Sequence, residues 1–481
     1  MPELRNKMER LKARAKISSP ERSKEESVYF IGIGGIGMSA LARYIHSIGI
    51  KVSGYDKTET VLTKLLVNEG IDVHYEDSMC LLDKNAAIVV YTPAVPKDHK
   101  EYNYYLEHNY PVVKRSDLLG AVTNGSFNIC IAGTHGKTTT STMVAHILRH
   151  SEYGCNAFLG GIAVNYNTNF WSSDNNVSVV EADEYDRSFL KLSPDVAVIS
   201  SMDADHLDIY GTAENMEQAF IDFSAKVKPG GLLLSKYGLP RGKDLIAANH
   251  LTYHLQNDQA DVFAKNITTA NGSYRFDVCI KNRLLENVLL NMGGMHNIEN
   301  VLAAIAIAQH LKIDDDKIKD AVATFRGVKR RFEYILLPSP SRIGRAEAEL
   351  VMIDDYAHHP EELRALITGA KLLFPGKKCT IVFQPHLFSR TKDHAAGFAA
   401  VLDLADEVIL LPIYPARELP MEGVSSEMIT EKMKNKNNCV MSKEALLEWM
   451  KCNKTELLIT AGAGDIDTLV EPIKNIITNK N

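Results

Sequence analysis

The sequence lacks the features of several protein classes. Its 481 residues include only seven Cys, at irregular positions and without a CxxC pair. This pattern fits a reducing compartment better than a disulfide framework, and it leaves no thiolate metal site. No apolar run reaches the ~18 residues that a membrane-spanning helix requires, and the polar stretch 1–27 does not have the composition of a signal peptide. We therefore expect a soluble, cytoplasmic protein that does not insert into a membrane.

An excess of positive charge is also missing. The chain has 54 Lys and Arg against 60 Asp and Glu, a formal net charge of −6. Without a global positive field to attract a phosphate backbone, nucleic acid is not an expected partner. The chain does have length and apolar content, since 45% of its residues are hydrophobic. At ~150 residues per domain, it is long enough for about three domains with separate cores.

Short apolar strands occur in three successive series and alternate with helical stretches. The first series lies at 28–33, 51–55 and 87–92, the second starts at Phe127, Val177 and Val196, and the third starts at Val351, Cys379, Glu407 and Glu456. This pattern predicts an α/β protein with three successive domains and mainly parallel sheets. The predicted divisions are a polar, frayed or weakly helical tail at 1–27 and domains at 28–122, 123–333 and 334–481.

The first strand leads into a glycine-rich segment, GIGGIGMSA. Its glycines satisfy G-x-G-x-x-G between a strand and a helix, where backbone N–H groups can bind a diphosphate. Asp56, about 20 residues further on, is a candidate for a ribose hydroxyl. The pattern does not separate NAD from a UDP-sugar, and a tight structural turn is the alternative. The candidate glycines are Gly32, Gly34, Gly35 and Gly37.

A second glycine cluster, IAGTHGKTTT, predicts an ATP site. It lies between a strand and a helix, where Lys137 can neutralise β- and γ-phosphate oxygens and the Thr138 hydroxyl can bind Mg²⁺. The motif is shorter than the general P-loop pattern, because Ile131 stands where the first glycine would be. The candidate ATP-binding residues here are Gly133, Thr134, His135, Gly136, Lys137, Thr138 and Thr139.

Magnesium that bridges two phosphates needs further hard ligands. Glu181 ends one predicted strand of the same domain, and His206 follows another. A capping carboxylate and a hydrogen-bonded loop histidine are the alternatives. We favour the metal site, because open parallel sheets bind ligands at the carboxyl ends of their strands. Thr138, Glu181 and His206 are therefore the predicted metal ligands.

Two polar segments near the end of the second domain are further candidates. His296, Asn297 and Asn300 open a helix, and the two Asn lie one turn apart on the same face, where they can read a base edge or support a catalytic loop. Roles as helix caps are the alternative. Arg330 and Arg331 can place a cation against a migrating phosphoryl group, whereas the alternative is a solvated patch.

Polar residues follow two strands of the third domain, in IDDYAHHP and FQPHLFSRT. Two neighbouring His suggest zinc, but His358 and His359 would point in divergent directions. We therefore interpret both segments as polar ligand-binding loops. Their candidate residues are Asp355, Tyr356, His358, His386 and Arg390.

Taken together, these segments resemble the Mur ligases of peptidoglycan synthesis. GIGGIGMSALA, AGTHGKTTT, EADEYDRSF, DADHLD, MHNIEN, RRFE, DDYAHHP, QPH..SRT and GAGDI occur in the family's order and at its spacing over 29–465. The resemblance implies a UDP-binding domain, a central ATPase domain and a Rossmann-like domain that binds an amino acid. It also implies an ATP-dependent acid–amino-acid ligase of the bacterial cytoplasm, with a role in cell wall synthesis, cell shape and division.

The resemblance implies roles for individual residues. It assigns the first glycine loop and Asp56 to the UDP-sugar, and the catalytic roles to Lys137, His206, Arg331 and His358. His206 and His358 are both candidates, on residue type alone, for the group that takes the ammonium proton. It assigns Thr138, Glu181 and His206 to two Mg²⁺ sites, His296, Asn297, Asn300, Arg331 and Asp355 to ATP, and Tyr356, His358, His386 and Arg390 to the amino acid.

Within the family, the resemblance points to the branch that joins L-alanine to the lactyl carboxylate of UDP-N-acetylmuramate through an acyl phosphate. Sibling ligases use a carbamylated lysine after the DHxD motif, and the matching stretch AENMEQAFID has no lysine. One residue departs from the branch: Leu387 stands where QPHRYTR has Arg. This leaves Arg390 as the clearer partner for a carboxylate.

Other functions remain as alternatives. They are a recycling ligase that attaches a whole tripeptide, a folylpolyglutamate synthase-like ligase, an NAD-dependent dehydrogenase and a non-catalytic nucleotide sensor. The loop QPHLFSRT disfavours the first, and the N-terminal GIGGIG unit disfavours the second. We expect a monomer or a homodimer.

Overall fold

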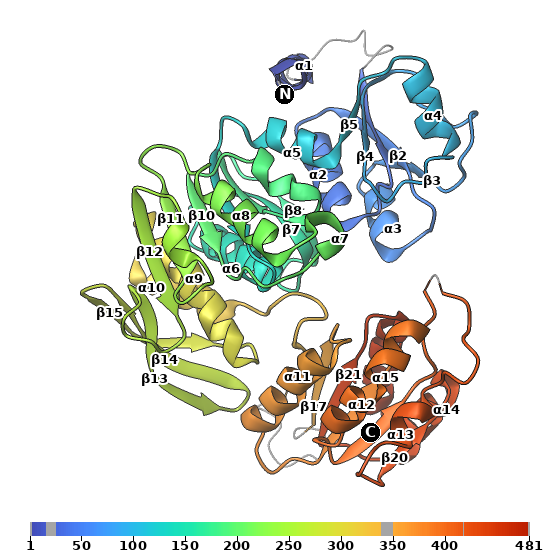
Figure 1. Cartoon of the computed structure of the whole chain (residues 1–481). Coiled ribbons are helices and arrows are strands. Elements are labelled where there is room, and N and C mark those ends of the chain that lie inside the picture. The colour runs from blue at the N-terminus through green and yellow to red at the C-terminus, as the bar shows by residue number, and fades with distance from the viewer. Residues whose placement is uncertain (1, 16–25, 338–349, 417, 480–481) are drawn as a thin grey trace. The chain divides into compact units, whose positions relative to one another are not determined.

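The three series of short strands form three sheets, so the predicted fold class is confirmed. The computed structural model describes residues 2–15, 26–337, 350–416 and 418–479 (Figure 1). Its contacts divide the chain into two compact units. The first unit comprises 1–162, 166–263 and 300–321, and the second comprises 163–165, 264–299 and 322–481. Among the described residues, no helix is both long and apolar enough to cross a bilayer.

The N-terminal sheet of the first unit has five parallel strands in the order β3-β2-β1-β4-β5. The strand order reverses between β1 and β4, and ligands bind open α/β sheets at the carboxyl ends of the strands at such a point. The first glycine loop follows β1 at this place. The elements are β1 (Ser27–Ile31), α2 (Ile36–Ser47), β2 (Lys51–Tyr55), α3 (Val61–Asn68), β3 (Asp72–His74), β4 (Ala86–Tyr91), α4 (Lys100–Glu107), β5 (Val112–Lys114) and α5 (Arg115–Thr123).

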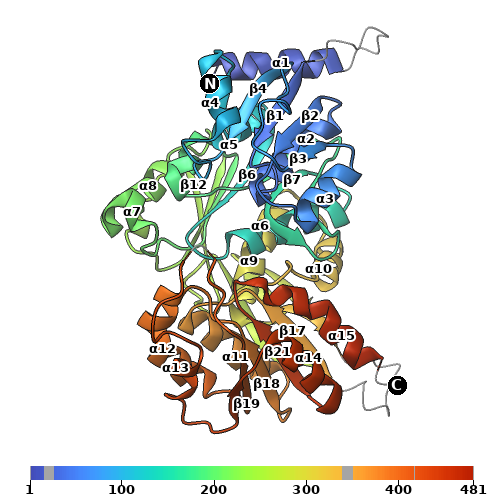
Figure 2. The same cartoon turned by 90° about the vertical axis from the view of Figure 1, so that its right-hand side faces the viewer.

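The predicted frayed or weakly helical tail contains a packed helix, α1 (Pro2–Ala15), which lies against α5 (Figure 2). Met8 and Leu11 are buried in the core of the first unit, and Leu4 and Ala15 pack against it. These four residues recur at intervals of three and four, so they form an apolar stripe along one helix face. The helix therefore forms because this stripe has a surface to cover. Residues 16–25 of the predicted tail lie outside the described residues.

The central sheet of the first unit runs in the order β12-β11-β10-β6-β9-β7-β8. β6 lies between β10 and β9, and the second glycine loop follows it. β13 (Val262–Ala270) begins in this unit, and α9 (Met295–His310) and α10 (Asp315–Thr324) have residues in both units. The other elements are β6 (Phe127–Ala132), α6 (Lys137–His150), β7 (Asn156–Ala163), β8 (Thr168–Trp171), β9 (Val177–Glu181), β10 (Val196–Ile199), α7 (Leu207–Tyr210), α8 (Ala213–Ser224), β11 (Leu232–Lys236) and β12 (Asn249–His254).

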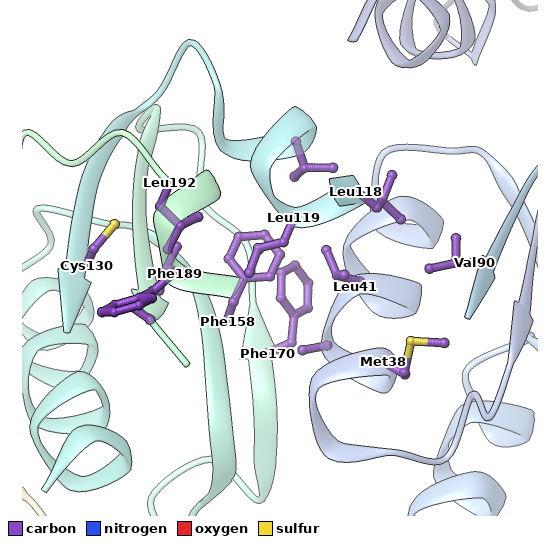
Figure 3. Packing of buried hydrophobic residues seen from close by; sticks show 14 of the residues in the cluster. Met38, Leu41, Val90, Leu118, Leu119, Cys130, Phe158, Phe170, Phe189 and Leu192 are labelled. Atoms are coloured by element: carbon purple, nitrogen blue, oxygen red, sulfur yellow. The ribbon is translucent and has the colours of Figure 1, made fainter. Parts of the chain in front are cut away.

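One hydrophobic core joins the two sheets of the first unit. Figure 3 shows the rings of Phe158 and Phe170, from β7 and β8, beside Leu41 of α2 and Leu119 of α5. The two Phe rings are tilted, with centroids 5.5 Å apart. This is a favourable geometry for an aromatic pair. The shared core holds the two glycine loops in a defined relation.

The second unit contains an antiparallel pair, β14 and β15, and a C-terminal sheet in the order β16-β17-β21-β18-β19-β20. Among the described strands of the C-terminal sheet, β16 pairs antiparallel and the others pair parallel. Figure 2 shows α12 and α13 on one side of this sheet and α14 and α15 on the other. The elements are β14 (Ser273–Ile280), β15 (Arg283–Leu290), β16 (Glu333–Leu336), β17 (Val351–Asp355), α11 (Pro360–Leu373), β18 (Cys379–Phe383), α12 (Phe388–Leu402), β19 (Glu407–Leu410), α13 (Glu427–Thr430), β20 (Asn438–Val440), α14 (Lys443–Cys452), β21 (Leu457–Ala461) and α15 (Val470–Thr478).

A buried polar cluster fastens α2 to β8 within the first unit. The Asn169 amide donates to the Ile36 carbonyl at 2.6 Å and to Ser39 Oγ at 3.0 Å, and its oxygen accepts from Arg43. Arg43 also forms an ion pair with Glu69, with Nε and Oε2 2.7 Å apart. Since α2 follows the first glycine loop directly, this cluster holds the loop against the central sheet.

We expect Asn169→Ala to lower the free energy of unfolding by about 1–3 kcal/mol, because it leaves buried partners without a hydrogen bond. Denaturant unfolding would measure the change. Asn176→Ala is the control, since Asn176 is exposed and donates only to the Gly125 carbonyl. An equal loss in both variants would contradict a special role for the buried cluster.

Candidate functional site

The second glycine loop lies between β6 and α6, and contacts with two serines fix its conformation. Gly133 has a φ of 130°, and a Cβ at this position would collide with Ser200 Oγ. Ser201 Oγ accepts from the His135 N–H at 2.7 Å and lies 2.8 Å from Thr134 Oγ1. Two serines that follow β10 therefore hold the loop at the start of a helix, where backbone N–H groups and the helix dipole favour an anion.

Lys137 lies folded back over this loop. Its Nζ donates to the Gly133 carbonyl at 2.6 Å and to Glu184 Oε1 at 2.7 Å. Glu184 is buried, with 1% of its surface exposed. Burial raises the pKa of Glu184, and the Lys137 ammonium opposes that shift. The sequence did not single out Glu184, although it lies in the acidic run EADEYD beside the predicted ligand Glu181.

Two of the predicted metal ligands are in direct contact. The Thr138 hydroxyl donates to Glu181 Oε1 at 2.9 Å, and the Gly160 N–H donates to Glu181 Oε2 at 2.9 Å. A Cβ at Gly160 would collide with the carboxylate, so this approach requires glycine. A hydroxyl and a carboxylate are oxygen ligands of the kind that Mg²⁺ prefers. The residues present therefore fit this ion.

The other candidates of the first unit surround the same loop. His206 begins α7 in the left-handed conformation, with φ 50°, and its Nε2 lies 3.9 Å from Glu184 Oε1. Asn300 lies against the loop, because a Cβ on Gly136 would be 2.7 Å from its Oδ1. Thr139 is buried in α6.

The first glycine loop is hydrogen-bonded to the Asp56 carboxylate. The Gly34 N–H donates to Asp56 Oδ2 at 2.7 Å, and the Thr58 N–H donates to Oδ1 at 3.3 Å. Gly32 has a φ of 85°, and Gly35 is the N-cap of α2. The Asp56 carboxylate thus supports the loop, and its role toward a ribose hydroxyl stays a prediction.

A cavity of about 280 Å³ in the first unit extends from the first glycine loop to Glu181 at the end of β9. Gly35 and Gly37 line one part, and Glu181 and Asp183 line another. The Arg115 guanidinium also lines it, forms an ion pair with Asp183 at 3.1 Å and packs over Gly37. Arg115 and Asp183 were missed from the sequence. The signal for Arg115 was its place directly after β5, at the sheet edge that carries the glycine loop.

His296 and Asn297 lie in the first turn of α9, in the second unit. The Asn297 amide donates to the Gly293 carbonyl at 2.6 Å. Burial lowers the pKa of His296, and the positive charge of Arg331 lowers it further. The charge of Arg331 thus acts on His296, and the assignment of both residues to ATP stays a prediction.

Asp355 fastens the RRFE segment to the end of β17. Its Oδ2 accepts from the Phe332 N–H at 2.6 Å, and its Oδ1 accepts from the Ala357 N–H at 2.7 Å. Burial raises its pKa to about 6. Both oxygens bind the backbone of the protein, so the role of Asp355 at an ATP ribose stays a prediction.

Arg330, the first of the two neighbouring arginines, has several contacts within the second unit. Arg330 donates to the Gly462 carbonyl, lies 3.5 Å from Asp354 Oδ2 and covers the ring of Tyr356 at 5.1 Å from its centroid. The alternative of a solvated patch is therefore wrong for Arg330, which fastens β17 to the loop after β21. Arg331 remains the candidate for contact with a phosphoryl group.

The predicted amino-acid residues form a group at the carboxyl ends of β17 and β18. Arg390 Nη1 donates to His386 Nδ1 at 3.3 Å, and the His386 ring stacks on Tyr414 with centroids 5.8 Å apart. His358 Nδ1 lies 2.9 Å from the Tyr356 carbonyl, so this nitrogen carries a proton in the hydrogen bond. The rings of His358 and His386 are 6.3 Å apart. Tyr414 was not predicted.

Comparison with known proteins gives the family. The model "Mur ligase family, catalytic domain" matches residues 27–126, "Mur ligase middle domain" matches 131–308, and "Mur ligase, glutamate ligase domain" matches 330–464. The chain belongs to the Mur ligase family. The resemblance carried by its sequence motifs is thereby confirmed.

Relatives and a solved structure match over nearly the whole length. A UDP-N-acetylmuramate–L-alanine ligase of Flavobacterium johnsoniae is 46% identical over 460 residues, which cover 95% of this chain and 98% of that protein. One of Cytophaga hutchinsonii is 46% identical over 457 residues, covering 93% and 96%. The crystal structure of a Thermotoga maritima UDP-N-acetylmuramate-alanine ligase has a TM-score of 0.80 at 28% identity and covers 95% of this chain and 100% of that chain.

The predicted ATP residues of this Mur ligase fall into two groups. The first unit holds the P-loop residues and Asn300, and the second holds His296, Asn297, Arg331 and Asp355. That the two groups serve one nucleotide stays a prediction.

Asp354, beside this second group, generates a pH prediction. The Thr460 hydroxyl donates to Asp354 Oδ1 at 2.6 Å, and burial raises the pKa of Asp354 to about 7, against ~3.9 in an unfolded chain. The folded chain thus binds this proton more tightly, so the wild type loses stability as pH rises from about 4 to about 7. Asn cannot ionise, and its oxygen can accept the same bond.

We therefore expect the free energy of unfolding of Asp354→Asn, relative to wild type, to rise by more than ~1 kcal/mol between pH 4.5 and 7.5. Denaturant titrations at several pH values would measure it. Parallel pH curves for the two proteins would refute the assignment.

Proposed function

We propose that this Mur ligase joins L-alanine to the lactyl carboxylate of UDP-N-acetylmuramate, with ATP converted to ADP and phosphate. The observation that carries the proposal is the cavity that extends from the first glycine loop to Glu181, whose carboxylate accepts a hydrogen bond from Thr138 of the P-loop. A UDP-sugar whose diphosphate lies at Gly35 and Gly37 has its acid end in this cavity, toward Glu181 and the P-loop. The names of the full-length relatives support the same substrates.

The chemistry begins at the carboxylate, which is a poor acyl donor because it has no good leaving group. Transfer of the γ-phosphoryl group of ATP to a carboxylate oxygen breaks the bond to ADP and forms an acyl phosphate. Lys137 and Arg331 offset the charge that would repel the incoming anion. Thr138, Glu181 and His206 would hold Mg²⁺, which supplies further positive charge on the phosphate oxygens.

The amine of alanine then attacks the acyl carbon, and the tetrahedral intermediate expels phosphate. Arg390 binds the alanine carboxylate, and Tyr356 and His386 complete this end of the site. We assign the ammonium proton to His358, because its Nδ1–H is bound to the Tyr356 carbonyl and its Nε2 lone pair can accept. His206 is the alternative acceptor, but one of its ring nitrogens would donate its lone pair to Mg²⁺, so that lone pair could not take the proton.

We place this reaction in the bacterial cytoplasm and expect the enzyme to be a monomer or a homodimer. The few irregular Cys suit a reducing compartment. Of the described Cys, all seven are free thiols.

Phosphate release tests the function directly. With Mg²⁺, ATP and UDP-N-acetylmuramate, we expect release with L-alanine to exceed that with glycine, L-serine or the tripeptide. Lys137→Ala is the inactive control, with turnover reduced ~10²-fold or more by loss of the charge. Fastest release with the tripeptide would identify a recycling ligase, and ATP binding without amide product would refute ligation.

We expect Arg390→Ala to raise the KM for alanine by ~10–100-fold, because a charge-assisted hydrogen bond contributes about 1.5–3 kcal/mol. The KM for ATP should change little. Lys392→Ala removes an exposed cation from the same helix and serves as the matched control. An unchanged alanine KM in Arg390→Ala would remove Arg390 from the pocket.

A further inference from the structure

The Glu184 carboxylate is buried between two groups of the P-loop site. Its Oε1 lies 2.7 Å from Lys137 Nζ and 3.9 Å from His206 Nε2. No described residue forms a hydrogen bond with its Oε2, although this atom is fully buried. Leaving a buried carboxylate oxygen without a partner is costly. Such an exception calls for an explanation beyond folding.

The local fold does not depend on this carboxylate. The Tyr210 hydroxyl donates to the Glu184 carbonyl at 2.6 Å, and the Arg187 N–H donates to the same carbonyl at 2.9 Å. The Arg187 guanidinium lies over the Tyr210 ring, 5.2 Å from its centroid. The backbone of Glu184 is therefore held by contacts that do not involve its carboxylate.

Lys137 is occupied within the protein in this conformation. Its Nζ donates to the Gly133 carbonyl, to Glu184 and, at 3.5 Å, to the Thr134 carbonyl. A triphosphate carries more negative charge than one carboxylate, and the flexible lysine stem allows the ammonium to move to it. Binding of the phosphates thus takes the lysine from Glu184 and leaves a buried carboxylate without its cation.

His206 is a second partner within reach of that carboxylate. A histidine that binds a metal through one ring nitrogen usually donates the N–H of the other nitrogen to a carboxylate, which fixes its tautomer and its orientation. If Glu184 accepts from His206 Nε2–H, the Nδ1 lone pair is left for the metal. A small approach from 3.9 Å to hydrogen-bond distance is sufficient.

We propose that Glu184 is a positioning residue that exchanges partners, holding Lys137 in the P-loop before ATP binds and orienting His206 after the lysine has moved to the phosphates. The inference rests on the proposed use of ATP and Mg²⁺. It couples arrival of the nucleotide to preparation of the metal ligand, and it requires no contact between Glu184 and substrate.

Glu184→Gln tests the exchange, because it keeps the size of the side chain and removes its charge. Titration of a non-hydrolysable ATP analogue without Mg²⁺ isolates the competition for Lys137. We expect the Kd to fall ~3-fold or more, since an uncharged amide competes less for the ammonium. An unchanged or higher Kd would overturn the proposal.

For the same variant we expect slower turnover, although the ATP analogue binds more tightly. A Gln amide can donate to His206 Nε2 and so favour the wrong tautomer. We expect kcat to fall ~10-fold or more and the Mg²⁺ concentration for half-maximal turnover to rise. Tighter nucleotide binding with slower turnover separates this role from a structural one, in which binding and turnover are both lost.

Two further variants complete the experiment. Tyr210→Phe loosens the same segment and leaves the carboxylate intact, so its analogue affinity should stay within ~2-fold of wild type. Glu184→Asp keeps the charge and should restore part of the Mg²⁺ response. A Tyr210→Phe profile identical to that of Glu184→Gln, or no recovery in Glu184→Asp, would overturn the proposal. Analogue binding is measured without turnover, so it is independent of whether wild type forms the amide.

Discussion

The site of the first unit depends on the hydrogen bonds of the Glu181 carboxylate. The carboxylate accepts from the Thr138 hydroxyl on the P-loop side and from the Gly160 N–H on the β7 side, and it lines the cavity that reaches the first glycine loop. One side chain at the end of β9 therefore links the second glycine loop with this cavity. Gly160 is part of this constraint, because any larger residue would displace the carboxylate.

Two cations of this site are paired with carboxylates of the protein. Lys137 is bound to Glu184, and Arg115 is bound to Asp183. The pairs hold the positive groups in place. A phosphate that replaces a carboxylate obtains a cation that is already near its final position. The arrangement lowers the net gain in binding, and in return it ties ligand arrival to a rearrangement of charge.

The second unit uses buried acids for a different purpose. Asp355 binds backbone N–H groups of the RRFE segment, and Asp354 is held by Thr460 and faces Arg330. Burial raises the pKa of both acids. Arg330, Asp354 and Asp355 thus hold the backbone of the RRFE segment in place. Arg331 of the same segment remains the candidate for contact with a phosphoryl group.

The sequence by itself determined the local parts of this protein. Strand, glycine loop and helix follow one another within a few residues in each loop, so the P-loop with Lys137 and Thr138 could be read directly, and the order of the motifs identified the family. The alternation of strands and helices predicted parallel sheets. It did not predict the antiparallel β14 and β15, or the packing of α1, whose apolar stripe is hidden among charged residues.

Only the tertiary structure decided which charged residues meet. Lys137 and Glu184 are 47 positions apart, and Arg115 and Asp183 are 68 positions apart. No periodicity joins residues at such separations, because their proximity follows from the order of strands in a sheet and from a shared core. The same holds for Arg330 and Arg331, which are alike in composition and setting along the chain. Arg330 is fixed by the loop after β21, which the chain reaches more than a hundred residues later.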